Sequence, residues 1–203
     1  MQRIYLLSFL LLLMFAACKK SGGNGGGPMS ISEYPLKVNN QWTYMVTDSV
    51  HNEVDTFVLK IVSKRSDGDT AFWNCNVYSH NSIVDTPCYV QTSTKIWLAN
   101  SSYNILSPSF LIDFPVSNNN VWIASPFNGD TAVATLLTST VTIGNRSYSN
   151  VYVIARSFQE VDFSFKQNIY IYKGLGLIGE SYAVMPFGPQ VRKNVELVAY
   201  SLN

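Results

Sequence analysis

Apolar and polar residues alternate over residues 161–172 of this chain. The apolar set is Val161, Phe163, Phe165, Ile169 and Ile171. The polar set is Asp162, Ser164, Lys166 and Asn168, and Tyr170 and Tyr172 fall on the same side. A period of two buries one face of a β-strand and leaves the other face in water. No stretch of the chain keeps apolar residues at helical spacing for three turns, so the chain is predicted to be β.

Nine further stretches are rich in β-branched and aromatic residues, which favour strands. They are residues 41–47, 54–63, 70–79, 83–90, 95–99, 131–143, 147–157, 177–184 and 191–201. Turn signals such as Gly144-Asn145 separate them, and the spacing leaves no room for crossover helices. We therefore expect an all-β, mostly antiparallel and strongly curved sheet, as a barrel, a half-barrel or a sandwich.

Two tryptophan segments, 34–42 and 114–122, share a pattern. Both contain, in order, an aromatic residue, proline, an aliphatic residue, two spacers, Asn-Asn, one spacer and tryptophan. Proline restricts the chain to an extended entry, and asparagine tolerates a left-handed turn before the tryptophan opens a strand. The repeat predicts two similar halves of the sheet, or else two independent strand starts of the same kind.

The first seventeen residues have the character of a signal peptide. Arg3 precedes an almost unbroken apolar run over residues 4–15, and the small pair Ala16-Ala17 follows before Cys18. A run of about a dozen residues is shorter than the roughly 20 that a membrane-spanning helix needs. We therefore expect this segment to be removed rather than to stay in the membrane.

The residues Phe15-Ala16-Ala17-Cys18 resemble the lipobox of bacterial lipoproteins. That resemblance implies a diacylglycerol on Cys18, cleavage before it and acylation of its new amino group. Two or three acyl chains anchor a protein stably, whereas one chain is marginal. The other interpretation is an ordinary secretory signal with an incidental cysteine.

The residues after Cys18 are glycine-rich and, as far as Pro28, contain nothing apolar to bury, which is typical of a flexible tether. We expect a signal peptide over 1–17, a lipidated cysteine with its tether over 18–30, and a single β-rich domain over 31–203.

Three short motifs, 34–44, 148–153 and 172–178, resemble a group of secreted lipoproteins common in Bacteroidetes. The resemblance implies a β-rich lipoprotein of the cell envelope, in a group largely without assigned biochemistry. It also implies the outer membrane. Lys19-Lys20 stands where surface-exported relatives carry acidic residues, which favours the periplasmic side.

Cys75 and Cys88 would share a compartment in which disulfides persist. If Asn81-Ser82 is a two-residue turn, position 75 lies opposite position 88 in a non-hydrogen-bonded pair, with Cα atoms about 4.5 Å apart. Pro87 then occupies a position that should donate a hydrogen bond, which implies an edge strand, a bulge or another register. The alternatives are a cross-strand disulfide and two unpaired buried thiols.

No motif indicates an enzyme, a metal or a cofactor. Residues 174–179 match Gly-x-Gly-x-x-Gly, but a strand rather than a helix is predicted after them, so we expect a turn between strands. His51 and His80 have no second ligand at metal spacing and are expected in solvated loops. Without Arg3, the 14 basic residues become 13, against 13 acidic residues. This balance gives no indication of nucleic-acid binding.

Aromatic residues make up 13% of the chain, and most are expected in the core. Tyr170, Tyr172 and Trp97 are the candidates for rings that face a ligand. We expect a non-catalytic, membrane-anchored envelope lipoprotein that binds an apolar ligand or a protein partner, which requires an apolar cavity or docking surface. The alternative is a carbohydrate-binding or glycan-handling accessory lipoprotein, which requires exposed rings beside polar groups.

Overall fold

The structure is a computed structural model that describes residues 26–99, 111–124, 131–159, 163–186 and 191–203. Within these residues the chain forms fifteen strands and one 3-10 helix, η1 (Ile31–Glu33). The strands of the first part are β1 (Gln41–Asp48), β2 (Glu53–Asp67), β3 (Thr70–Ser79), β4 (Ser82–Asp85), β5 (Cys88–Gln91), β6 (Lys95–Ala99) and β7 (Leu111–Asp113). Those of the second part are β8 (Val121–Ile123), β9 (Thr131–Leu137), β10 (Val141–Ile143), β11 (Arg146–Tyr148), β12 (Val151–Gln159), β13 (Phe163–Tyr172), β14 (Gly176–Pro186) and β15 (Val191–Ser201).

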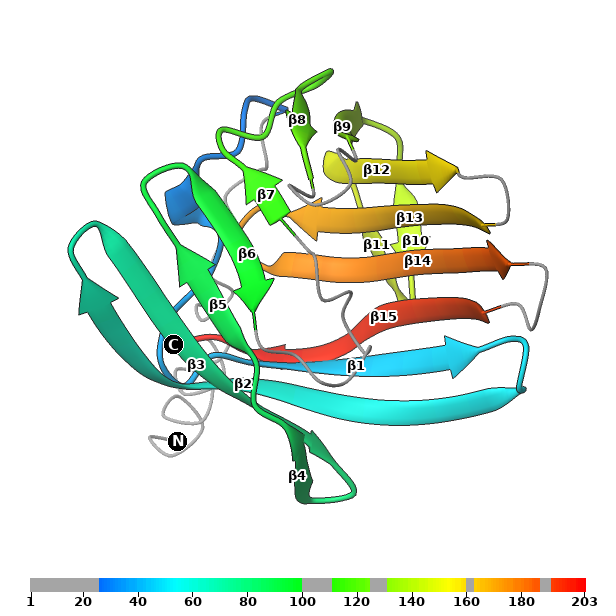
Figure 1. Ribbon diagram of the computed structural model, residues 1–203, viewed down its shortest axis with the longest axis horizontal. Coiled ribbons are helices and arrows are strands. Elements are labelled where there is room, and N and C mark those ends of the chain that lie inside the picture. Colours follow the sequence, from blue (N-terminus) through cyan, green and yellow to red (C-terminus); the bar gives the residue numbers. More distant parts are fainter. Residues whose placement is uncertain (1–25, 100–110, 125–130, 160–162, 187–190) are drawn as a thin grey trace, which may run out of the picture.

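Twelve of these strands follow one another in a single sheet, in the order β7-β6-β5-β3-β2-β1-β15-β14-β13-β12-β9-β8, and β4 pairs with β3 beside this path. The described neighbours are antiparallel, and the sheet curls into a nearly closed barrel (Figure 1). The two edge strands approach each other at the seam, where Trp122 Nε1 in β8 donates a hydrogen bond to the carbonyl oxygen of Leu111 in β7 at 3.1 Å. The prediction of an all-β, antiparallel, strongly curved sheet is confirmed.

Each half of the chain contributes six neighbouring strands to the barrel. The first half supplies β1-β2-β3-β5-β6-β7 and the second half supplies β8-β9-β12-β13-β14-β15. The halves are joined where β1 pairs with β15. The barrel is thus two successive meanders, which confirms the prediction of two similar halves at the level of strand order.

The same turn starts both meanders. Asn40 Nδ2 donates to the carbonyl oxygen of Pro35 at 2.7 Å, and Asn120 Nδ2 donates to that of Pro115 at 2.8 Å. The asparagine before each of them has a positive φ, 72° in the first copy and 65° in the second. The backbone carbonyl of each bonding asparagine accepts from the next strand of its meander, at 3.0 Å and 2.8 Å. The sequence repeat therefore specifies one local structure twice.

The ordered domain starts before Ile31. Met29 is fully buried and forms an isolated antiparallel bridge with Val116, and Tyr152 donates its hydroxyl to the carbonyl oxygen of Gly27 at 2.8 Å. The predicted boundary between tether and domain is wrong by a few residues, because Met29 is an apolar side chain with a site to fill.

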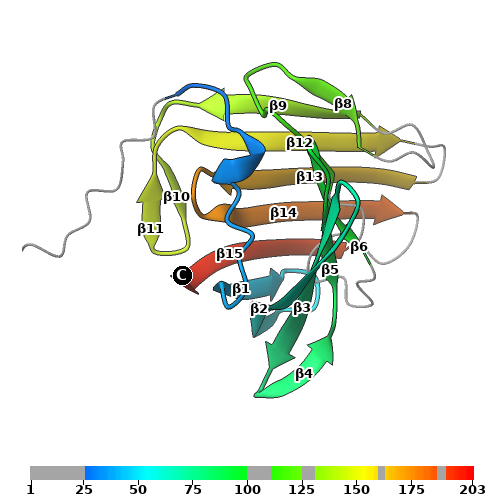
Figure 2. The same cartoon turned by 90° about the vertical axis from the view of Figure 1, so that its left-hand side faces the viewer.

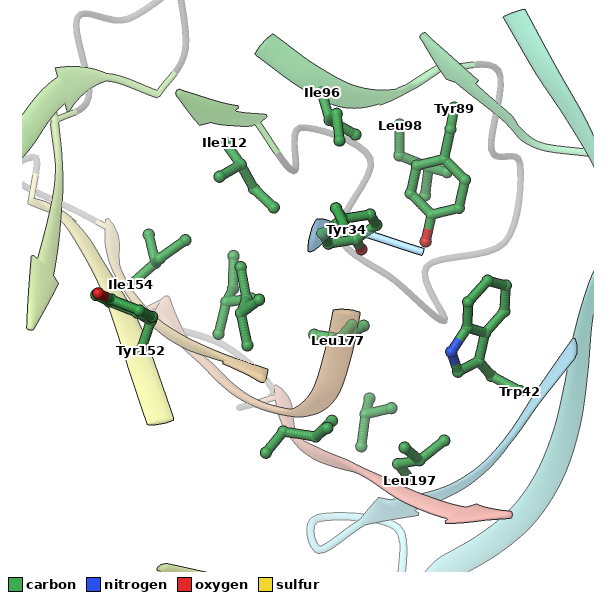
Figure 3. Packing of buried hydrophobic residues seen from close by; sticks show 14 of the residues in the cluster. Tyr34, Trp42, Tyr89, Ile96, Leu98, Ile112, Tyr152, Ile154, Leu177 and Leu197 are labelled. Carbon is green, nitrogen blue, oxygen red and sulfur yellow. The ribbon is translucent and has the colours of Figure 1, made fainter. Parts of the chain in front are cut away.

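Tyr34 follows η1 and projects into the barrel between its two walls (Figure 3). Its ring meets those of Tyr89 and Phe114 edge-on, with centroids 6.2 Å and 6.4 Å apart. Complete burial raises the pKa of its hydroxyl well above the ordinary value. Figure 3 shows Leu177 and Ile112 on opposite sides of the Tyr34 ring. In this part of the barrel the described side chains form a packed core.

Candidate functional site

A groove runs along the outer face of β14, between β13 and β15. Its floor consists of the outward-pointing residues Gly179, Ser181 and Ala183, each paired directly with one residue of either neighbouring strand. The wall on β13 consists of Lys166, Asn168 and Tyr170, and the wall on β15 of Arg192, Asn194 and Glu196. Two hollows of about 230 Å³ and 320 Å³ lie along it and share Ser181 and Asn194. We call this site the β14 groove.

The floor of the groove is low because its residues are small. Glycine and alanine are poor strand formers, and glycine inside a strand marks a place where another group approaches the backbone closely. The residues that alternate with them, Glu180 and Tyr182, point into the barrel. From Gly179 to Ala183 a strand extends about 13 Å, so the groove can hold an extended ligand of a few units.

The hairpin of β10 and β11 closes one end of the groove. It is a separate two-stranded sheet, and Figure 2 shows it on the side of β13–β15 that faces away from β5 and β6. Ile143 lies over Gly179, where an added Cβ would be 3.0 Å from Ile143 Cγ2. The Arg146 guanidinium stacks on the Tyr200 ring at 4.8 Å. Only glycine at position 179 lets the hairpin pack at this distance.

Neutral hydrogen-bonding groups occupy the middle of the groove. Asn168 Nδ2 donates a long hydrogen bond of 3.4 Å to Ser181 Oγ. Asn194, on the facing wall, is exposed, and its amide bonds to no other described side chain. Each amide offers a donor and an acceptor in one plane, and the hydroxyl can act as either. These groups suit a ligand that carries many hydroxyls.

Charged groups are separated toward the two ends of the groove. Lys166 and Arg192 face each other across Ala183. Tyr170 and Glu196 face each other across Gly179, beside the hairpin. Among the described residues, neither Lys166 nor Arg192 forms an ion pair or a cation–π contact. The groove thus has a cationic end and an end with a carboxylate and an aromatic ring.

A buried polar chain lies directly behind the groove, inside the barrel. Arg156 Nη1 donates to Gln167 Oε1 at 3.0 Å, and Gln167 Nε2 donates to Glu180 Oε1 at 2.7 Å. The three residues are 3%, 1% and 5% exposed, and the guanidinium also lies over the Phe165 ring at 5.5 Å. Gln167 stands between two wall residues of β13, and Glu180 between two floor residues of β14. Because neighbours on a strand face opposite sides, this chain specifies which residues point into the groove.

Tyr170 is the one of the three proposed ligand-facing aromatic residues that lies at the groove. Tyr172 is on the same outer face but under the hairpin, where its ring meets Tyr148 edge-on at 5.2 Å. Trp97 is half-buried on β6, in the other wall of the barrel, where it pairs with Leu111. The structure therefore does not bring the three rings together.

The cysteine register differs from the prediction by one residue. Ser79 pairs with Ser82, so the turn is His80-Asn81, and a bulge follows in β3. Both turn residues have positive φ, as the common two-residue hairpin turn requires. Cys88 consequently lies opposite Asn74 instead of Cys75. Since adjacent strand positions face opposite sides, the two buried thiols point to different faces of the sheet and are unbonded in this structure.

Burial raises the pKa of the Cys75 thiol to about 12. We expect iodoacetamide at pH 8 to leave Cys75 unmodified in the folded protein and to alkylate it in denaturant, as peptide mass spectrometry can measure. A fully labelled Cys75 in the folded protein, or a Cys75–Cys88 bridge in the unreduced protein, would contradict the register described here.

Sequence reasoning put Lys166 and Asn168 on a polar strand face but missed the groove they belong to. It also left out Gln167, which interrupts the apolar face of the same strand. A polar residue at a core position was the available signal, because buried amides need partners. Arg192 and Asn194 left no comparable signal. Cys18, with the rest of the predicted signal peptide, lies outside the described residues.

Among the described residues, no helix is long and apolar enough to cross a membrane. In the same part of the chain, no three histidine, cysteine or acidic side chains are grouped so that they could hold a metal ion.

Two solved structures are similar to this chain. A protein of Parabacteroides distasonis, provisionally described as a lipoprotein, aligns with 83% of this chain and 97% of its own length, with a TM-score of 0.50 and 11% identity. A protein of Bacteroides fragilis, provisionally described as exported and as having a YmcC-like fold, aligns with 83% of this chain and 98% of its own, with a TM-score of 0.48 and 7% identity. No family model matches the sequence, and no curated protein does. The first likeness shows a shared antiparallel barrel fold.

Proposed function

We propose that this protein is a lipid-anchored lipoprotein of the cell envelope that binds a glycan in the β14 groove without reacting with it. The observation that carries the proposal is the groove itself, with a floor of small residues, two asparagine amides and a serine hydroxyl in its middle, and the Tyr170 ring at one end. Amides and hydroxyls recognise sugar hydroxyls by paired hydrogen bonds, and a ring beside them offers a surface for a sugar face.

The lipid anchor is supported by the lipobox at residues 15–18 and by the fold shared with a protein provisionally described as a lipoprotein. The eight residues from Cys18 to Gly26 extend about 28 Å at most. A domain on such a short tether would meet glycans close to the membrane surface. We retain the outer membrane, on its periplasmic side, as the proposed location.

The apolar-ligand hypothesis has less support in the described residues. It requires an apolar cavity, whereas Met29 and Tyr34 fill the barrel interior beside Leu177 and Ile112. Three of the four tryptophans, Trp42, Trp73 and Trp122, are also buried. Any glycan site therefore depends on the polar groups of the groove and on Tyr170, with no platform of tryptophan rings.

The proposal predicts that Asn168→Ala and Asn194→Ala each weaken oligosaccharide binding at least tenfold, since each removes a paired donor and acceptor. The full chain, purified in detergent, would be screened on an array of defined oligosaccharides, and Kd would be measured for the best one. Asn74→Ala is the matched control, because Asn74 is an exposed asparagine of the outer face on the other wall. The bound sugar should be recovered with unchanged mass.

Three results would contradict the proposal: no binding to any sugar on the array, equal affinity in the three asparagine variants, or cleavage of the sugar. A retained lipid in native mass spectrometry, displaced by neither groove variant, would favour the apolar-ligand function instead.

A further inference from the structure

Two cations stand on opposite walls of the β14 groove with no acidic partner among the described residues. Lys166 and Arg192 are both exposed and are both paired with Ala183. Their strands are separated by one strand, so their backbones are about 10 Å apart. The Ala183 methyl group leaves the space between them open. Two long side chains can therefore converge on one group above Ala183.

The backbone at this end is held in place. Ser49 donates both its backbone N–H and its hydroxyl to the carbonyl oxygen of Arg192, at 3.0 Å and 3.4 Å. Ser49 also lines the hollow at this end of the groove. The guanidinium is a planar fork that binds a carboxylate or sulfate through two parallel hydrogen bonds, and the Lys166 ammonium adds a point charge. An anion would also relieve the repulsion between the two cations.

The opposite end of the groove has the reverse preference. Glu196 lies there beside Tyr170 and under Ile143, about 13 Å along the strands from the two cations. A carboxylate at that end repels an anion and accepts hydrogen bonds from neutral hydroxyls. The groove can therefore distinguish the two ends of a ligand that carries an acidic group at only one of them.

We infer that the β14 groove selects acidic glycans and binds the acidic group of one sugar unit between Lys166 and Arg192, with neutral units extending toward Tyr170 and Glu196. This inference rests on the proposed glycan-binding function and adds the substrate class and the direction of binding.

The test compares ligands that differ only in charge. The array would carry uronic-acid oligosaccharides, such as trigalacturonate, each beside its methyl ester, and Kd would be measured for the pairs that bind. We expect the acid to bind at least tenfold more tightly than its ester in 50 mM salt. Added salt should reduce that difference, because these charges are exposed. In a Lys166→Gln/Arg192→Gln protein, acid and ester should bind equally and as weakly as the ester binds to the unaltered protein.

The outcomes separate the two proposals. Equal binding of acid and ester, or a preference for the acid that survives in the double variant, overturns the acidic selectivity while leaving glycan binding in place if Asn168→Ala still weakens both ligands. Failure of every sugar to bind overturns both. Lys60→Gln is the matched control, since Lys60 is a cation of β2 outside the groove and its loss should leave the preference unchanged.

Discussion

Replacing Gln167 with alanine should lower the free energy of unfolding by about 3–5 kcal/mol, the cost typical of breaking a buried polar network that contains charges. Gln167 is 1% exposed and is the only residue that joins the Arg156 guanidinium to the Glu180 carboxylate through its own side-chain hydrogen bonds, as far as the described contacts show. Its removal takes one hydrogen bond from each charged group and leaves a cavity. Urea unfolding followed by tryptophan fluorescence measures the change.

Asn168→Ala is the control on the same strand. Asn168 faces outward, is half-buried and makes only the long 3.4 Å bond to Ser181, so it should cost less than about 1 kcal/mol. A loss of stability in Gln167→Ala no larger than in this control would show that the buried chain does not hold the strands in register. The control matters for function too, because a stable Asn168→Ala protein that fails to bind sugar has lost the site and not the fold.

The second large effect is expected at the repeated turn. Asn40→Ala should cost about 2–4 kcal/mol and Asn120→Ala about 1 kcal/mol, although both remove the same bond to a proline carbonyl. Asn40 is 2% exposed, and its amide oxygen also accepts the backbone N–H of Asn203 at 2.8 Å. Asn120 is half-buried, so water can replace what it loses.

Differential scanning calorimetry of the two variants would measure this asymmetry. The repeat would lose its structural meaning if neither substitution lowered the melting temperature. If the two costs were equal, burial would not be the reason for the difference, and the two halves of the barrel would contribute alike.

Much of the fold was predictable because it depends on local patterns. Alternation placed Ile169 and Ile171 inside and Lys166 outside, and this requires only that a strand have two faces. The Asn-Asn turns before Trp42 and Trp122 were predictable for a similar reason, since proline and left-handed asparagine restrict the backbone within a few residues. The turn between β13 and β14 also follows from its glycines, and Gly174 and Gly176 indeed have positive φ.

The cysteine prediction shows where local reasoning ends. A turn placed one residue too late, followed by a bulge that the alternation does not show, moved Cys88 from a position opposite Cys75 to one opposite Asn74. Since the side-chain period is two, an error of one residue in register transfers a side chain to the other face of its partner strand.

The chain's own pattern of residues was enough to establish β-structure, two related halves and the polarity of each strand face, because these properties arise between neighbours in sequence. The β14 groove arises between strands. Its floor and walls become a site when β14 lies between β13 and β15, with the β10–β11 hairpin over Gly179, and that arrangement is set by backbone pairing and by the buried chain from Arg156 to Glu180. Side chains that are distant in sequence act together here because the curvature and register of the barrel bring them within reach of one ligand.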